Sequence, residues 1–249
     1  MKVFYFIIIN LIFISCATRK DIVYFQGNEQ VKFEDFYTVR FKKGDFLSIN
    51  IHGVDESSYK LFNLPEASSA ARGYTNGTPP SSGYLVDVNG NIDFPLLGYI
   101  QLEGLTILEA TELLKKKLKD YILNPIISIK IQNYKVTILG EVRNPGTFTI
   151  PNEKISIVEL LGLAGDLTIN ALRHNIKVIR EENNIKKEYI IDLTKKQFIS
   201  SPVYFLQQND IVYIEPNRSK INSSIIGSAA GVFISITTLL VSTINTITK

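Results

Sequence analysis

The sequence predicts an α+β fold, with two small soluble domains between two membrane-directed ends. Several short segments alternate apolar and polar residues, as half-buried strands do. Two other segments begin with a hydroxyl residue followed three positions later by Glu, which is the capping-box pattern of a helix N-terminus. Both ends of the chain are apolar and nearly uncharged. At 249 residues, the chain is long enough for one or two domains with cores of their own.

The N-terminus predicts a secretory signal followed by a lipid anchor. After Lys2, an apolar run reaches Ser15; it is too short to cross a bilayer but suits the core of a signal peptide. Ser15 precedes Cys16, the only cysteine, and this arrangement resembles a bacterial lipoprotein signal, in which the cysteine is acylated after cleavage. We therefore expect a signal peptide over residues 1–15, lipidation at Cys16 and a tether over residues 16–34. The alternative is an uncleaved anchor with a buried thiol.

The first domain is predicted to begin with two strands and a turn. Residues 37–41 and 46–51 alternate as strands do, and Gly44-Asp45 between them favours a tight turn. Residues 55–83 are rich in Ser, Ala, Gly, Pro and Asn, so we expect a long loop that has little to bury. Such loops often lie at a functional surface, but a flexible insertion without a role fits equally well.

A β-hairpin is predicted around Asn89-Gly90. These two residues accept the positive φ angles of a type I′ turn, and the residues on both sides alternate apolar and polar. Asp87 and Asp93 flank the turn, but the glycine and glutamate of a calcium loop are not at their required positions. The sequence therefore favours a hairpin over a calcium site.

A helix and a strand are predicted to complete this domain. Thr106 and Glu109 form a capping box, and apolar residues follow at helical spacing until Asn124-Pro125 ends the helix. Residues 126–131 then alternate as a strand. The lysines of the helix lie mostly outside its apolar stripe, which indicates a solvated face; contact with an acidic polymer or an anionic lipid is the alternative.

The second domain is predicted to be a smaller mixed unit of helix and strands. Its first hairpin turns at Pro145-Gly146, because proline and glycine suit the central positions of a type II turn. A second capping box, at Ser156 and Glu159, begins a helix that stops at Gly165. The predicted strands of this unit cover residues 135–142, 147–150, 176–180, 187–191 and 211–214.

The sequence carries no recognisable catalytic motif. It lacks the nucleophile elbow, the phosphate-binding loops and the zinc-protease motif. Its two histidines, His52 and His174, fall in different predicted domains and are not expected to share a site. We therefore expect no catalytic residues, no metal and no cofactor. With 27 basic and 24 acidic residues, the charge is also too balanced to indicate a nucleic-acid partner.

The sequence resembles the polysaccharide export domain of bacterial outer-membrane polysaccharide exporters in three stretches. These are YTVRFKKGDFLSINI, GYLVDVNGNIDFPLLGYIQLEGLT and YILNPIISIKI, which begin at Tyr37, Gly83 and Tyr121. They contain the recurring Gly-Asp turn, the Asp-Gly-type hairpin that leads to Pro-x-x-Gly, and Asn-Pro before a strand. The later stretches VTILGEVRNPGTFTI and LLGLAGDLT are similar to the soluble-ligand-binding β-grasp domain of the family. There, Asp166 stands where the family usually has a second glycine.

This resemblance implies a polysaccharide export domain over residues 35–132, one β-grasp domain over residues 133–217 and a C-terminal transmembrane helix over residues 221–248. It further implies a lipid-anchored homo-oligomeric ring in the outer membrane, with its soluble domains in the periplasm, through which capsular or extracellular polysaccharide leaves the cell. The implied partners are that polysaccharide, outer-membrane lipid and an inner-membrane polysaccharide co-polymerase that moves the polymer.

The C-terminal segment is compatible with such a spanning helix. Residues 221–248 carry no formal charge and as a helix would extend roughly 42 Å, enough to cross a bilayer with tilt. Small and polar residues recur there at steps of four and three, so they share one helical stripe. The stripe consists of Ser224, Ser228, Gly231, Ser235, Thr238, Ser242 and Asn245. The family's helical barrel implies that this stripe faces a pore or a helix seam; a plain single-pass anchor is the alternative.

Two other functions remain open. The main alternative is a lipid-anchored glycan-binding or scaffolding protein that forms no pore. A periplasmic polysaccharide-processing enzyme is a third, because the paired carboxylates of a glycosidase have no fixed sequence spacing.

Overall fold

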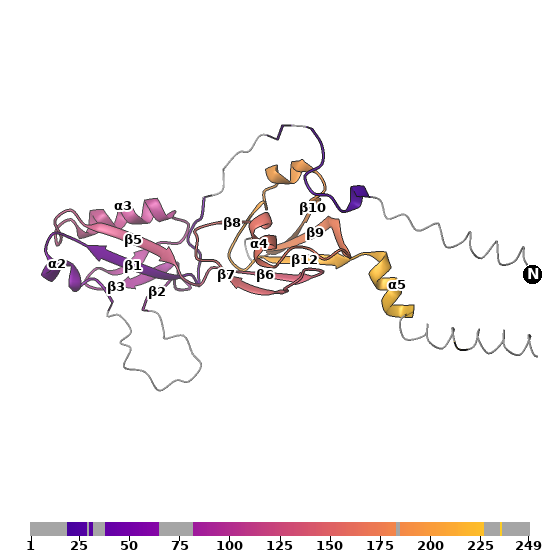
Figure 1. The fold of residues 1–249 in the computed structure, drawn as a ribbon. Helices are drawn as coiled ribbons and strands as arrows, with labels where there is room; N and C mark the ends of the chain where they lie inside the picture. The colour runs from indigo at the N-terminus through magenta and orange to yellow at the C-terminus, as the bar shows by residue number, and fades with distance from the viewer. Residues whose placement is uncertain are drawn as a thin grey trace, which may run out of the picture.

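The computed structural model describes residues 19–28, 30–31, 38–64, 82–182, 185–226 and 235. Most of them form two bodies, each with its own cluster of buried apolar side chains (Figure 1). The first body comprises residues 38–64 and 82–132, and the second body begins at residue 133. Both mix helices with strands, so the predicted α+β class is confirmed.

The first body is built on a three-stranded antiparallel sheet with β1 between β2 and β5. A separate hairpin, β3–β4, and the helix α3 complete it, and α3 packs on β5 (Figure 1). The apolar face of α3, with Ala110, Leu114 and Leu118, is fully buried. The elements are β1 (Phe46–His52), α2 (Glu56–Lys60), β2 (Tyr84–Leu85), β3 (Asn91–Phe94), β4 (Gly98–Gln101), α3 (Ile107–Leu118) and β5 (Ile126–Ile131).

The predicted hairpin around Asn89-Gly90 is wrong in its strand pairing. The turn itself is present, because Asp87 Oδ1 accepts hydrogen bonds from the N–H groups of Asn89 and Asn91, both at 2.8 Å, and Gly90 has a φ of +83°. However, β2 before the turn pairs with β1, whereas β3 after the turn pairs with β4. The turn therefore folds the chain back locally, with the Asp87 N–H on the carbonyl of Asn91 at 2.8 Å, but the strands on its two sides belong to different sheets.

The predicted loop over residues 55–83 begins with a short helix, α2. Asp55 caps this helix, since its carboxylate accepts hydrogen bonds from the N–H and hydroxyl of Ser57 and from the hydroxyl of Ser58. The composition of the segment as a whole predicts a loop and does not reveal this local cap. Residues 65–81 lie outside the described residues.

The second body contains a five-stranded sheet in the order β10-β9-β12-β6-β7. β12 runs parallel to β6, and all other neighbours in this sheet are antiparallel. The elements are β6 (Lys135–Gly140), β7 (Gly146–Thr149), β8 (Ile155–Ser156), α4 (Ile157–Leu163), β9 (Ala171–Glu182), β10 (Ile185–Ile191), η2 (Lys196–Ser200), β11 (Phe205–Leu206) and β12 (Ile211–Pro216).

Both predicted capping boxes are confirmed. Thr106 Oγ1 accepts from the N–H of Glu109 at 3.1 Å, and Glu109 Oε2 accepts from the N–H of Thr106 at 2.7 Å. Ser156 and Glu159 make the same two bonds at 3.2 and 2.7 Å. Each box pairs two backbone N–H groups near a helix start, where such groups otherwise lack partners.

The predicted pairing of β6 with β7 is confirmed. The type II turn at Pro145-Gly146 is wrong, because Gly146 is the first residue of β7, opposite Ile138, and lacks the positive φ that such a turn requires. β6 ends at Gly140, which has a φ of +93° and lies against β12. A Cβ at this position would stand 1.9 Å from the carbonyl oxygen of Ile214. Only glycine therefore allows β12 to lie so close to the end of β6.

Part of the predicted tether is docked on the second body. Tyr24 donates its hydroxyl proton to Asp166 Oδ1 at 2.7 Å, and Arg173 lies over the Tyr24 ring at 5.5 Å. The N–H groups of Phe25 and Gln26 donate to two carbonyls of the loop after β10, at 3.1 and 2.7 Å. Burial and the bond to Asp166 raise the pKa of the Tyr24 hydroxyl to about 12, so it stays a donor at neutral pH.

Asp166 makes this contact from a strained backbone conformation, which leads to a prediction. Its φ is +73°, a region that glycine adopts freely but that costs other residues about 1 kcal/mol. Asp166→Gly removes two hydrogen bonds of about 1 kcal/mol each, from the Tyr24 hydroxyl and the Leu167 N–H, and relieves about 1 kcal/mol of strain, so the free energy of unfolding should fall by only about 1 kcal/mol. Amide hydrogen exchange at Phe25 and Gln26 should nevertheless become faster.

Asn209→Gly is the matched control. Asn209 has a φ of +65° and lies in the turn before β12, so this change relieves similar strain without touching the tether. It should leave exchange at Phe25 and Gln26 unchanged. Equal exchange in the Asp166→Gly and wild-type chains would show that the Tyr24 bond does not hold the segment.

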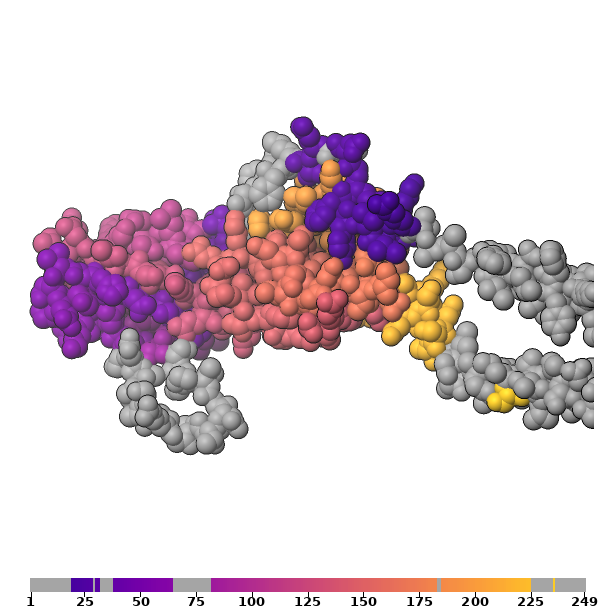
Figure 2. Space-filling view, in the orientation of Figure 1, coloured from indigo at the N-terminus to yellow at the C-terminus, as the bar shows by residue number. Residues whose placement is uncertain are grey.

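Both ends of the described chain lie at the same end of the second body. η1 (Arg19–Asp21) and α5 (Arg218–Ile226) are found at the end that faces away from the first body (Figures 1 and 2). Among the described residues, no helix is both long and apolar enough to span a membrane. The predicted transmembrane helix falls mostly outside the description, which covers only residues 221–226 and 235 of it.

Candidate functional site

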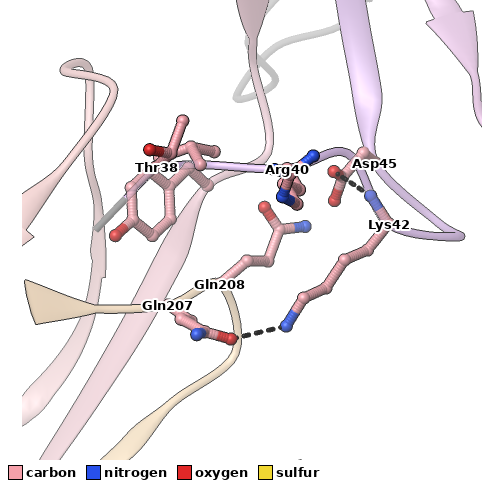
Figure 3. A pocket seen from close by; sticks show the side chains of 8 residues that line it. Thr38, Arg40, Lys42, Asp45, Gln207 and Gln208 are labelled. Carbon is pink, nitrogen blue, oxygen red and sulfur yellow. Dashed lines mark hydrogen bonds between the residues drawn. The ribbon is translucent and has the colours of Figure 1, made fainter. Parts of the chain in front are cut away.

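A cavity of about 180 Å³, to which mostly polar and charged residues contribute, lies where the two bodies meet. Both bodies contribute to its walls, and Figure 3 shows Lys42 of the first body reaching toward Gln207 of the second. The amide of Gln208 lies between these two and Arg40 in the same view. The lining residues are Thr38, Val39, Arg40, Lys42, Asp45, Tyr134, Gln207 and Gln208.

The chain that enters the first body supplies one wall. Residues 37–41 were expected to form a strand, but within the described part of this range, residues 38–41, the structure has only an isolated bridge between Arg40 and Thr106. The Arg40 side chain donates to the carbonyl of Gly104 at 2.7 Å and to Glu109 Oε2 at 3.2 Å. Glu109 is also the carboxylate of the capping box. The start of α3 therefore fixes the position of this wall.

Lys42 connects the two bodies. Its ammonium group donates to Gln207 Oε1 at 2.7 Å, while its backbone N–H donates to Asp45 Oδ2 at 2.8 Å. Asp45 is only 2% exposed, and burial raises the pKa of its carboxyl group to about 6, although the hydrogen bond and the charge of Lys42 act in the opposite direction. The backbone of Lys42 thus holds the buried carboxyl group, while its ammonium group reaches the other body.

The turn between β11 and β12 supplies the opposite wall. Asp210 ends this turn and accepts the N–H of Gln207 at 2.7 Å. Asp210 is itself held by Arg180, in a buried pair with a shortest distance of 2.7 Å. Gln208 Oε1 is buried and, among the described residues, has no hydrogen-bond partner. Since buried polar atoms are normally paired, this oxygen is an exception within the described part of the chain.

The described residues show no catalytic arrangement. His52 ends β1 beside the ring of Tyr59, and His174 lies on β9 of the other body. Within the described part of the chain, no group of three His, Cys, Asp or Glu side chains is placed to hold a metal ion.

The site residues predicted from the sequence are not brought together by the described structure. Ser224 is exposed on α5, where its hydroxyl donates to the carbonyl of Ile221 at 2.7 Å. Ser235 is helical and exposed. The others lie outside the described residues: Cys16, Ser228, Gly231, Thr238, Ser242 and Asn245.

Sequence reasoning missed the cavity, apart from one signal. Gly44-Asp45 was recognised as a turn, and the turn does place the Asp45 carboxylate on the N–H of Lys42. Nothing in the sequence pattern pairs Lys42 with Gln207, because the two lie 165 positions apart. Only the docking of the two bodies creates the site.

Asp45 predicts that the stability of the chain depends on pH. Its pKa rises from 3.8 to about 6 on folding, so the folded chain binds more protons than the unfolded chain between these values. The contribution of Asp45 to the free energy of unfolding should therefore be largest below about pH 4 and be lost as the pH rises toward 6. A change of about two pKa units corresponds to about 3 kcal/mol.

Asp45→Asn should remove the part of the pH dependence of stability that Asp45 contributes. Asn does not titrate, and it keeps an acceptor for the Lys42 N–H. Urea unfolding at pH 4 and pH 7 measures the effect, with Asp93→Asn, at an exposed position on β3, as the control. The wild-type and control chains should both lose stability between the two pH values. The same loss in Asp45→Asn would assign the pH dependence to other groups.

Comparisons with known proteins cover both bodies. Residues 34–132 match the model of a family described as polysaccharide biosynthesis/export protein, and residues 134–214 match the model of the SLBB domain. The chain is 26% identical over 185 residues to the EPS I polysaccharide export outer membrane protein EpsA of Ralstonia solanacearum. It is 28% identical over 131 residues to the protein of the same name from Ralstonia nicotianae. These alignments cover 72% and 51% of this chain but only 48% and 34% of the relatives, so the chain spans about half their length or less.

Proposed function

The chain belongs to the polysaccharide biosynthesis/export protein family, and from this premise we propose that it exports an extracellular polysaccharide across the outer membrane. The observation that carries the proposal is the succession of an export domain and an SLBB domain over residues 34–214. The family is one of transport proteins and not of enzymes. The relatives named above are outer membrane export proteins, which supports the same location for this chain.

The finer proposal is a homo-oligomeric ring that is anchored in the outer membrane at both ends of the chain. Cys16 carries the lipid, and residues 221–248 cross the membrane as a helix whose small and polar stripe faces a pore or a helix seam. The position of η1 and α5 at one end of the second body supports this arrangement (Figure 1). Arg19 follows Cys16 by three positions, which span at most about 10 Å, so the second body would lie close to the membrane. The first body would then point into the periplasm, toward an inner-membrane co-polymerase.

Deletion of the gene tests export directly. The deletion strain should release little or no extracellular polysaccharide and should retain polymer in the periplasm. The wild-type gene should restore release, and Cys16→Ala at equal protein level should not, because the unlipidated chain would not fractionate with the outer membrane. Normal polymer release by the deletion strain would reject the proposal.

The oligomeric state separates the pore from a lipid-anchored glycan-binding or scaffolding protein. Full-length protein extracted in detergent should form rings visible by electron microscopy, and these rings should conduct ions after reconstitution. A monomer without conductance would favour the scaffold. Deleting residues 221–249 should weaken but not abolish the oligomers if the soluble bodies supply the lateral contacts.

A further inference from the structure

We propose that η1 and α5 bind the phosphate headgroups of anionic phospholipids at the end of the second body that faces away from the first (Figures 1 and 2). The inference rests on the proposed function, since it takes both ends of the chain to enter the outer membrane. The two helices carry four cationic side chains and a single acidic one, that of Asp21. The four cationic residues, called the basic end below, are Arg19, Lys20, Arg218 and Lys220.

The charges of the basic end are available to a partner. All four residues are exposed, and within the described part of the chain none of them forms an ion pair with a carboxylate. Glu215, which ends β12 just before α5, is already engaged by Lys177 at 2.9 Å and by Asn175 at 2.8 Å. The positive charge is therefore not neutralised by this nearby carboxylate.

The start of α5 adds to the positive potential. Arg218 and Lys220 lie in its first turn, which contains no acidic residue. A helix start carries a partial positive charge, so acidic side chains are normally favourable there and cations are not. By contrast, α3 and α4 each have a glutamate in the first turn. An anion from outside the chain would offset the repulsion at the start of α5.

The position of the basic end in the chain identifies a membrane as the source of this anion. Lys220 directly precedes the uncharged segment 221–248 that is proposed to span the membrane, and Arg19 follows Cys16 by three positions, at most about 10 Å. Cations beside a membrane segment are attracted by the negative surface potential of anionic lipids. Their long side chains keep the charged group in the headgroup layer while the methylene stem covers apolar surface.

The two residue types make different contacts with a lipid phosphate. The guanidinium groups of Arg19 and Arg218 are able to donate two parallel hydrogen bonds to one phosphate, whereas the lysines act as point charges. In the proposed ring of identical subunits, the basic ends would repeat around the ring and form a band of positive charge. Such a band would fix the height of the second body at the membrane surface.

The test compares an anionic and a neutral lipid at the surface of the full-length protein. The wild-type chain is reconstituted in phosphatidylcholine vesicles that contain a trace of spin-labelled phosphatidylglycerol or spin-labelled phosphatidylcholine. Electron paramagnetic resonance gives the fraction of each label that the protein immobilises. At low salt, phosphatidylglycerol should be enriched about threefold over phosphatidylcholine. In about 1 M salt, where the Debye length is only about 3 Å, the enrichment should disappear.

Replacing all four residues of the basic end with Gln should abolish the enrichment at low salt. Arg19→Lys/Arg218→Lys keeps the charges and should retain most of it. The matched control removes four charges from the first body, at the C-terminal end of α3, and should leave the enrichment unchanged. This control is Lys115→Gln/Lys116→Gln/Lys117→Gln/Lys119→Gln.

Three results would overturn the proposal. The first is equal immobilisation of the two lipids by the wild-type chain, and the second is an equal loss of enrichment in the α3 control. The third needs no substitution, so it does not depend on the folding of a variant: it is an enrichment that persists in about 1 M salt. Binding of alginate, an acidic polysaccharide, by the wild type but not by the Gln variant, without any lipid enrichment, would assign the basic end to the polymer instead.

Alkaline carbonate separates this inference from the proposed anchoring. A wild-type chain that carbonate removes from the vesicles would contradict the anchoring and the inference together. A chain that stays in the vesicles but shows no enrichment would contradict the inference alone. Polymer release by the gene deletion strain tests the export function separately, because that result does not depend on the lipid headgroups.

Discussion

Asp210→Leu is expected to lower the free energy of unfolding by about 3–5 kcal/mol, since it leaves the buried guanidinium of Arg180 without its counter-charge. The two side chains are 1% and 3% exposed. Arg180 donates to both carboxylate oxygens of Asp210, at distances between 2.7 and 3.1 Å. It also donates to the carbonyls of Pro202 and Phe205, at 3.2 and 2.8 Å. One ion pair thus ties β9, the segment before β11 and the start of β12 together.

The double variant Arg180→Met/Asp210→Leu is the informative control. It removes both charges at once, so no buried charge remains uncompensated, and it should recover at least half of the loss. The recovery should be incomplete, because the carbonyls of Pro202 and Phe205 lose their donor. Urea unfolding of the full-length chain in detergent gives the free energy of unfolding of the wild type, of Asp210→Leu and of the double variant. If Asp210→Leu alone proves as stable as the wild type, the pair does not hold these strands together.

Asp210→Leu should also disturb one wall of the cavity. Asp210 accepts the N–H of Gln207, which in turn accepts from Lys42, so the ion pair fixes the wall that bears Gln207 and Gln208. The loss of the bond between Lys42 and Gln207 is therefore expected in this variant.

Replacing Ser228, Ser235 and Ser242 together with Leu is expected to abolish polymer release. These serines belong to the stripe proposed to face a pore or a helix seam, and leucine there would remove its polar surface or block close packing. Membrane insertion should be intact, because leucine is favourable at the centre of a spanning helix. Export and membrane fractionation are measured in the deletion strain at equal protein level.

The opposite face of the same helix provides the control. Replacing Ile226, Phe233 and Leu240 with other aliphatic residues should hardly change export, because this face is proposed to meet lipid. Both triple changes leave the segment apolar, so only the position of the side chains differs. Equal export from the two variants would reject the barrel and favour a plain single-pass anchor.

The sequence predicted correctly those features that depend on contacts between near neighbours in the chain. Both capping boxes formed as expected, because Thr106–Glu109 and Ser156–Glu159 lie one helical turn apart. The pairing of β6 with β7 was also expected, although the turn that joins them is not the predicted one at Pro145-Gly146. The resemblance to polysaccharide exporters, carried by turn motifs in a fixed order, was confirmed by the matches over residues 34–132 and 134–214.

The tertiary structure alone decided which distant segments meet. The turn at Asn89-Gly90 formed, but β2 pairs with β1 and β3 pairs with β4. Which strands pair depends on the fit between segments that are distant in the sequence, so the local alternation of apolar and polar residues does not predict it. Tyr24 reaches Asp166 across 142 positions, and Lys42 reaches Gln207 across 165. Such pairs form because two separately folded surfaces fit together, and the energy of that fit is spread over many residues. The sequence therefore determined the fold class and the family, whereas the docked tether and the cavity exist only in the folded chain.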